Sequence, residues 1–218
     1  CERQEKAGIV TAKLRQEIKE MLVKLRPTLR VATLLTKLAE RDLAASDFAQ
    51  AEKSLRRAIE VAAKLLAVYE QGKALSQAAR VAWKLEQQEW ARGLLKDVRR
   101  CCEKKVTRRG AITRDALLHH LVVSLGQIED VKGAIEVAKG MQVSELGQQA
   151  LLDAVAAACK AGDLQIVDKV AKKIVYKAKL ALARTHLYGA HYRVGSPKSA
   201  ERAFNSVYSA AKAIRLPT

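Results

Sequence analysis

The stretch DVKGAIEVAKGM at residues 130–141 returns in outline as DLQIVDKVAKKI at 163–174 and SPKSAERAFNSV at 196–207. Each copy opens with a residue suited to capping a helix, and a small residue follows at Ala134, Val167 or Ala200, at steps of 33. Packing residues follow four and seven positions later: Ala138 and Met141, Ala171 and Ile174, Phe204 and Val207. One helical hairpin cannot bury its own apolar face, so this period predicts stacked hairpins.

Two further sets extend the pattern toward the N-terminus. Ala51, Leu55 and Ala58 repeat the spacing, and Gly93 fits between Ala51 and Ala134 with wider steps of 42 and 41. A turn with an acid or a serine precedes each set, at Ser46-Asp47, Glu89, Glu129-Asp130, Gly162-Asp163 and Gly195-Ser196.

Apolar residues recur at helical period along nearly the whole chain. Helices are predicted over residues 8–25, 29–43, 48–66, 74–85, 90–102, 113–125, 130–139, 144–160, 163–174, 176–192 and 197–214. Pro27 ends the first of them, and we expect a weak break near 70–72 and a loop at 108–110.

These patterns predict an all-α fold, a right-handed α-solenoid of about five stacked antiparallel helix pairs. We expect residues 1–27 to form an N-terminal helix that is a partial repeat or a cap, and residues 28–218 to form the helical-repeat domain. An irregular helical bundle with accidental spacing is the alternative. Because the chain begins at Cys1, we also expect a processed, truncated or internal piece of a longer protein.

Composition excludes several classes of protein. Among 218 residues, only 3 prolines and 11 glycines are available, too few turn formers for an all-β sandwich or barrel. No apolar run reaches the length of a membrane span. The sequence has no HExxH, P-loop or GxSxG motif and no metal-ligand set, so we expect no enzyme, cofactor or metal. The alternative is an enzyme that uses a reactive thiol at Cys101-Cys102, where neighbouring basic residues could lower the pKa of the thiol.

The segment 35–61, LTKLAERDLAASDFAQAEKSLRRAIEV, resembles a tetratricopeptide repeat. It has the Leu38-Ala39 pair of the first helix and small residues at Ala51 and Ala58 in the second, although Asp42 replaces an aromatic residue. Segment 116–174 also resembles pentatricopeptide repeats, through KGAIEVAKGM at 132–141 and DAVAAACKAGD at 153–163. Together the resemblances cover about residues 29–218.

The first resemblance implies a scaffold for partner proteins, and the second implies binding of single-stranded RNA, one base per repeat. The base-reading positions that the second resemblance implies are Thr36, Ala78, His119, Leu152 and Thr185. Alanine and leucine offer a base edge no donor or acceptor, so we do not expect a regular base-reading code.

Charge separates into basic and acidic segments. The chain carries 40 Lys and Arg against 23 Asp and Glu, or +17, which favours an acidic partner. Residues 92–109 carry +6 and residues 164–218 carry +9, whereas 110–163 carry −3. The residues predicted to bind nucleic acid or an acidic partner are Arg99, Arg100, Lys104, Lys105, Arg108, Arg109, Lys169, Lys172, Lys173 and Lys177. Tyr176, Tyr188, Tyr192 and Tyr208 could stack on bases, but we expect them to be buried.

The sequence therefore predicts a non-catalytic helical-repeat binding module whose basic surface holds RNA or a ribonucleoprotein. The alternative is a tetratricopeptide-type adaptor that holds an acidic protein segment. We expect an intracellular protein, in an organelle or a large assembly.

Overall fold

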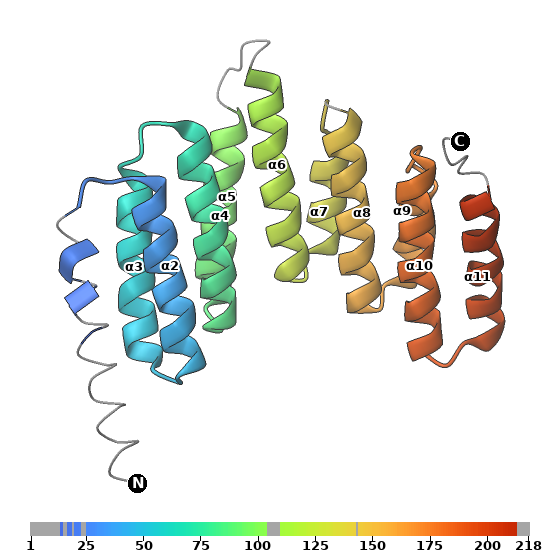
Figure 1. Cartoon of the computed structure of the whole chain (residues 1–218), viewed down its shortest axis with the longest axis horizontal. Helices are drawn as coiled ribbons and strands as arrows, with labels where there is room; N and C mark the ends of the chain where they lie inside the picture. Colours follow the sequence, from blue (N-terminus) through green and yellow to red (C-terminus); the bar gives the residue numbers. More distant parts are fainter. Residues whose placement is uncertain are drawn as a thin grey trace, which may run out of the picture. The chain divides into compact units, whose positions relative to one another are not determined.

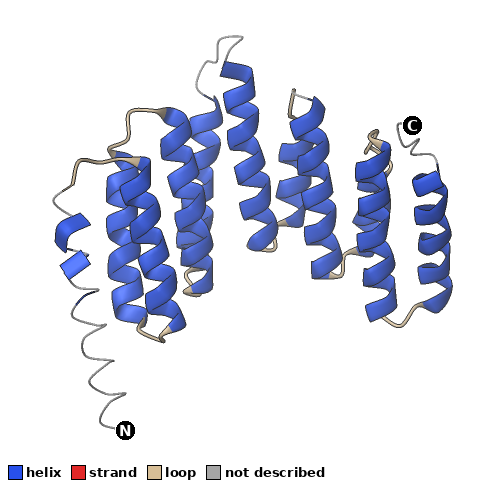
Figure 2. Cartoon of the chain, viewed as in Figure 1, coloured by secondary structure: helices blue, strands red, loops and turns tan. Residues whose placement is uncertain are grey.

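The computed structural model describes residues 14, 17, 18, 20–22, 25–103, 110–142 and 144–212. Helix is the only regular secondary structure in these ranges (Figure 2). The helices are α2 (Leu29–Ala44), α3 (Phe48–Ala63), α4 (Val68–Lys84), α5 (Gln88–Glu103), α6 (Gly110–Gln127), α7 (Val131–Lys139), α8 (Ser144–Ala161), α9 (Leu164–Ala171), α10 (Lys177–Arg193) and α11 (Pro197–Lys212). The all-α prediction is confirmed for this part of the chain. The helix predicted over 8–25 lies mostly outside the described residues.

The chain divides into two compact units, Cys1–Cys101 and Cys102–Thr218. In the first unit, α2 packs against α3 and α4, and α3 packs against α4. In the second unit, α6 contacts α7 and α8, α8 contacts α7, α9 and α10, and α10 contacts α9 and α11. The helices of each unit thus pack in adjacent antiparallel pairs (Figure 1), such as α2 with α3, α6 with α7, and α10 with α11.

Five turns between paired helices share one backbone geometry. A single residue in each adopts a positive φ, at Ser46, Glu86, Glu129, Gly162 and Gly195. The next residue then donates its backbone N–H to a carbonyl five residues earlier, at 2.9–3.0 Å. This bond satisfies a carbonyl that the end of the helix would otherwise leave without a partner.

The same turns start the following helices. The Asp47 and Asp130 carboxylates accept from the backbone N–H three residues on, at 3.2 and 3.0 Å. The fourth residue after each turn's cap is fully or almost fully buried, in the order Ala51, Ala91, Ala134, Val167 and Ala200. The predicted burial of Ala51, Ala134, Val167 and Ala200 is therefore confirmed.

Two predicted boundaries in the first unit are wrong. The turn between α4 and α5 lies at Glu86-Gln87, whereas Glu89 lies inside α5, so Ala91 and not Gly93 is the matching small residue. The break expected near 70–72 lies instead between α3 and α4, at Lys64–Ala67. Gly72 is buried inside α4, where its small size serves packing.

Two predicted features of the second unit also differ. Phe204, predicted as a packing residue, is 54% exposed. Its ring lies against that of Tyr188, with 5.8 Å between the centroids, because α11 packs mainly against α10. The second difference is the end of α9, which comes at Ala171 and not at residue 174.

We predict that Gly162→Ala lowers the free energy of unfolding by about 1–2 kcal/mol, the cost of a left-handed conformation for a residue with a Cβ. Gly162 has a φ of 80°, and a Cβ there would meet no atom within 4 Å, so the backbone alone is tested. Denaturant unfolding measures the effect. The control is Gly189→Ala inside α10, where the nearest atom would be Arg193 Nη1 at 3.7 Å, and it should stabilise slightly. Equal effects of the two changes would contradict the prediction.

Candidate nucleic-acid interface

The first predicted basic cluster is described only in part. Arg99 and Arg100 are exposed on α5, and Arg100 Nη1 lies 2.8 Å from Asp97 Oδ1. Lys104, Lys105, Arg108 and Arg109 lie outside the described residues. This cluster therefore supplies no site geometry.

The four predicted lysines of the second basic segment, residues 164–218, all lie among the described residues of the second unit. Lys169 is exposed in the last turn of α9, and Lys172 and Lys173 are exposed in the turn that follows it. Lys177 is exposed at the start of α10. Because α9 ends at Ala171 and not at residue 174, the four lysines do not share one helix face but follow the connection from α9 to α10.

A buried glutamine holds this connection. Gln148 of α8 is 9% exposed, and its Oε1 accepts from the Val175 backbone N–H at 2.6 Å. Its Nε2 donates to the Lys173 carbonyl at 3.3 Å. Both bonds fix the backbone beside Lys172 and Lys173, which places two exposed ammonium groups on a defined turn.

The same device occurs one repeat earlier. Asp115 of α6 is fully buried, and its Oδ2 accepts from the Gln142 backbone N–H at 2.7 Å. Gln148 and Val175 each stand 33 residues after Asp115 and Gln142, and 27 residues separate the partners in both pairs. The 33-residue period of the sequence is thus repeated in hydrogen bonding between a first helix and the loop after its second helix.

Next to Lys172, the end of α9 and facing residues along α10 and α11 line an open cavity of about 480 Å³. Its polar lining consists of Lys172, Arg184, His191, Ser199, Arg202 and Ser206. Its apolar lining consists of Ala171, Leu180, Leu187 and Ala203. Three permanent cations and an imidazole therefore converge from three elements, and no carboxylate stands among the lining residues that the structure describes. Arg184 is held in place because its Nη1 donates to the Ser206 carbonyl at 2.9 Å.

A matching position in the first unit shows why this cavity is open. Arg56 stands nine residues after Asp47, which precedes α3, and Lys172 stands nine residues after Asp163, which precedes α9. Trp90 stands three residues after Gln87, which precedes α5, and Ser199 stands three residues after Ser196, which precedes α11. The Arg56 guanidinium lies over the Trp90 ring, 5.0 Å from its centroid, which fills the space between α3 and α5. In the second unit, Ser199 replaces the indole with a hydroxyl, so the space beside Lys172 stays empty of side chains.

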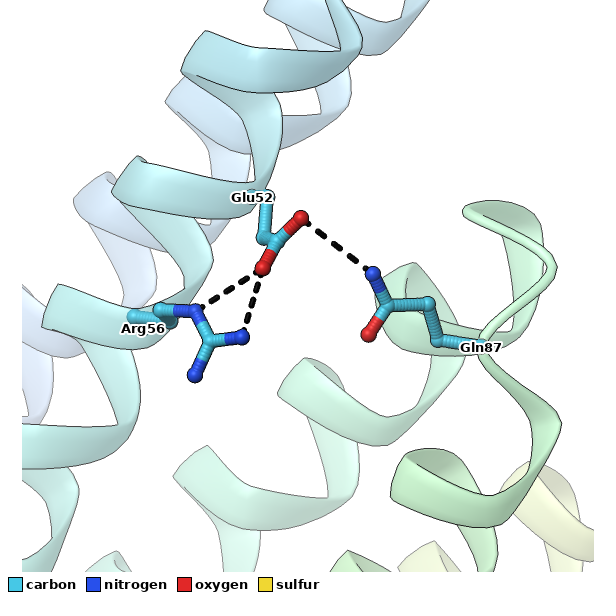
Figure 3. A network of polar contacts seen from close by, with 3 residues as sticks. All are labelled: Glu52, Arg56 and Gln87. Carbon is cyan, nitrogen blue, oxygen red and sulfur yellow. Dashed lines mark hydrogen bonds and ion pairs between the residues drawn. The ribbon is translucent and has the colours of Figure 1, made fainter.

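The charges in the first unit's groove are also neutralised (Figure 3). Arg56 donates to Glu52 Oε1 at 2.6 and 2.9 Å, and Gln87 Nε2 donates to Glu52 Oε2 at 3.3 Å. The Arg56 guanidinium of this groove is therefore already paired with the Glu52 carboxylate. Of these two grooves, the cavity of α9–α11 is therefore the better suited to an anion.

The sequence interpretation did not single out Arg184, His191 and Arg202. One signal was available, because Arg184 and His191 share a helical stripe with Leu180 and Leu187 at spacings of four, three and four. A basic residue on an apolar stripe indicates a charged group that faces another element. Arg202 carried no such signal, since only the packing of α11 brings it to the cavity.

The tyrosine prediction is wrong for three residues, since Tyr176, Tyr192 and Tyr208 are 41%, 72% and 56% exposed. Tyr188 is half-buried against Phe204.

Other candidate chemistry finds little support in the described residues. Thr36, Ala78 and Leu152, three of the base-reading positions, are buried and so are out of reach of a base edge. Cys101 and Cys102 are 7% and 5% exposed, which keeps their thiols from solvent. No group of three or more His, Cys, Asp or Glu side chains that could hold a metal ion occurs in the described part of the chain.

Comparisons of the chain with protein-family models, curated proteins and solved structures find no match. Within the described ranges, no helix combines the length and apolar character that crossing a membrane requires.

We predict that Gln148→Ala speeds hydrogen exchange of the Val175 amide about 10-fold or more, because the amide loses a buried acceptor worth about 1–3 kcal/mol. Exchange measured residue by residue by NMR tests this. Gln149→Ala is the matched control, since Gln149 follows on the same helix and bonds Asp153 Oδ1 at 3.2 Å. Unchanged exchange at Val175 in Gln148→Ala would show that the glutamine does not hold the turn.

Proposed function

We propose that this chain is a non-catalytic helical-repeat module whose basic surface, formed by the α9–α10 connection and the cavity of α9–α11, holds RNA or a ribonucleoprotein. The observation that carries the proposal is the cavity itself, where Lys172, Arg184 and Arg202 converge without a described carboxylate. The +9 charge of residues 164–218 supports it, because a local excess of cations attracts phosphates.

The fold-level part of the proposal is a right-handed solenoid of about five hairpins. The five turns of equal geometry support it, together with the neighbour-to-neighbour contacts inside each unit. In such a module, each hairpin adds surface to an extended binding face. The resemblance to pentatricopeptide repeats agrees with RNA as the ligand, but the buried positions 36, 78 and 152 favour contact through phosphates rather than base edges.

We predict that a single-stranded RNA binds with an affinity that falls linearly on a log–log plot against salt, since each phosphate contact releases counterions. The double change Lys172→Glu with Lys173→Glu should weaken binding about 10-fold or more and reduce the magnitude of the slope by about 1.4. Fluorescence anisotropy at several salt concentrations measures both quantities.

The control is Lys139→Glu with Lys160→Glu, which makes the same change in net charge at two exposed lysines of the second unit away from the cavity. If the two double variants lose the same affinity, binding depends on net charge and not on this surface. Binding that is insensitive to salt would contradict the proposal.

A groove of about 1130 Å³ in the first unit favours the second candidate function, an adaptor for an acidic protein segment. It lies beside the start of α2 and the connection between α3 and α4. Its charged lining consists of Arg26, Arg30, Lys37, Lys64 and Glu70. Leu34 and Leu66 also line it and are 41% and 100% exposed, so the groove suits a segment that carries both carboxylates and apolar side chains.

We predict that a synthetic amphipathic peptide of glutamate and leucine binds this groove, and that Lys37→Glu with Leu66→Ser weakens it about 10-fold, a loss typical of removing one favourable contact of each kind. Isothermal titration calorimetry measures the affinity. The control is Lys53→Glu with Phe48→Ser, at an exposed lysine and an exposed phenylalanine of α3 outside the groove. Equal losses in both variants, or no binding at all, would remove this candidate.

A further inference from the structure

We infer that the cavity of α9–α11 receives the terminal phosphate monoester of an RNA strand, so that the module holds a strand by its end. This inference rests on the proposed function, and it names the part of the RNA that the site takes.

The positive charge of the side chains that line the cavity is larger than the negative charge of one internal phosphate. Lys172, Arg184 and Arg202 supply three positive charges, and His191 adds an imidazole that can donate or accept. An internal phosphodiester carries one negative charge, whereas a phosphate monoester carries about −1.5 to −2 near pH 7. A cavity with this many cations in one place is therefore better neutralised by a strand end. Asp168 and Glu201 are the carboxylates in residues 164–218, so the excess of basic charge extends beyond the cavity.

The lining of the cavity offers several donors to an oxyanion. Arg184 is half-buried, and its bond to the Ser206 carbonyl at 2.9 Å fixes the guanidinium while leaving further N–H groups. The hydroxyl groups of Ser199 and Ser206 also line the cavity. Leu187 and Ala203 are 7% and 6% exposed and form part of the apolar wall, which reduces competition from water for the ion.

The size and shape of the cavity agree with a chain end. Its volume of about 480 Å³ falls within the range of pockets that hold small molecules, and is suited to one nucleotide. Helix α9 has 8 residues and α11 has 16, so α9 is about 12 Å long beside a helix of about 24 Å. The cavity opens where the shorter helix ends, and Lys172 stands at that point.

The test compares three single-stranded RNAs of one sequence that carry a 5′-phosphate, a 3′-phosphate or hydroxyl groups at both ends. We expect one of the phosphorylated strands to bind about 10-fold more tightly than the hydroxyl strand, a gain consistent with charge-assisted hydrogen bonds to the added charge. Equal affinities of all three strands would overturn the inference and leave the proposed function standing. No binding of any strand would overturn both.

The deciding variant is Ser199→Trp. It introduces an indole at the position of α11 that corresponds to Trp90 in α5, and it leaves every charge unchanged. It should abolish the preference for the phosphorylated strand and weaken that strand more than the hydroxyl strand, because the lysines of the α9–α10 connection remain for other phosphate contacts. The control is Ser209→Trp, at an exposed serine of the same helix outside the cavity. If Ser199→Trp retains the preference, the cavity does not hold the terminal phosphate.

A second variant keeps the test valid if the indole disturbs folding. Lys172→Gln with Arg202→Gln removes two cations at exposed positions, so the fold should remain intact as measured by circular dichroism. This variant should lose the preference and also bind the hydroxyl strand somewhat more weakly. A preference of unchanged size would again overturn the inference.

Discussion

A single residue of positive φ closes each helical hairpin, and the position of the packing residues depends on it. Because the backbone reverses there, the next N–H reaches a carbonyl five residues earlier and the following helix begins at once. The fourth residue after the cap is then buried in every described hairpin, from Ala51 to Ala200. Glycine stands at the reversal in only two of the five turns, so the backbone bond, and not the residue type, is what the turns have in common.

The candidate site arises where the second unit departs from this regularity. Asp115 and Gln148 hold the loops after α7 and α9 in the same way, which keeps the repeat in register. Beyond the second of these loops, however, Ser199 of α11 occupies the position that Trp90 has in the first unit. A repeated scaffold thus positions Lys172, and a smaller side chain stands next to it. Functional sites on regular folds commonly arise from local changes of this kind.

The sequence predicted the helices, the small residues at 33-residue steps and the exposure of Lys169, Lys172 and Lys173, since all of these follow from periodicity. It did not predict the end of α9, because that end depends on Gln148, which is 25 and 27 residues away from its partners in the chain. It also misplaced the turn at Glu86, since a glutamate gives no sign of a left-handed conformation. The cavity was missed for a related reason, because Arg184 and Arg202 meet only through tertiary packing.

The packing of the second unit has a consequence for local unfolding. Among the described helices, α11 packs mainly against α10, whereas the basic cavity takes its lining from α9 as well as from α10 and α11. An occupant of the cavity would therefore join the α10–α11 hairpin to the end of α9, and occupancy should raise the free energy of opening this hairpin.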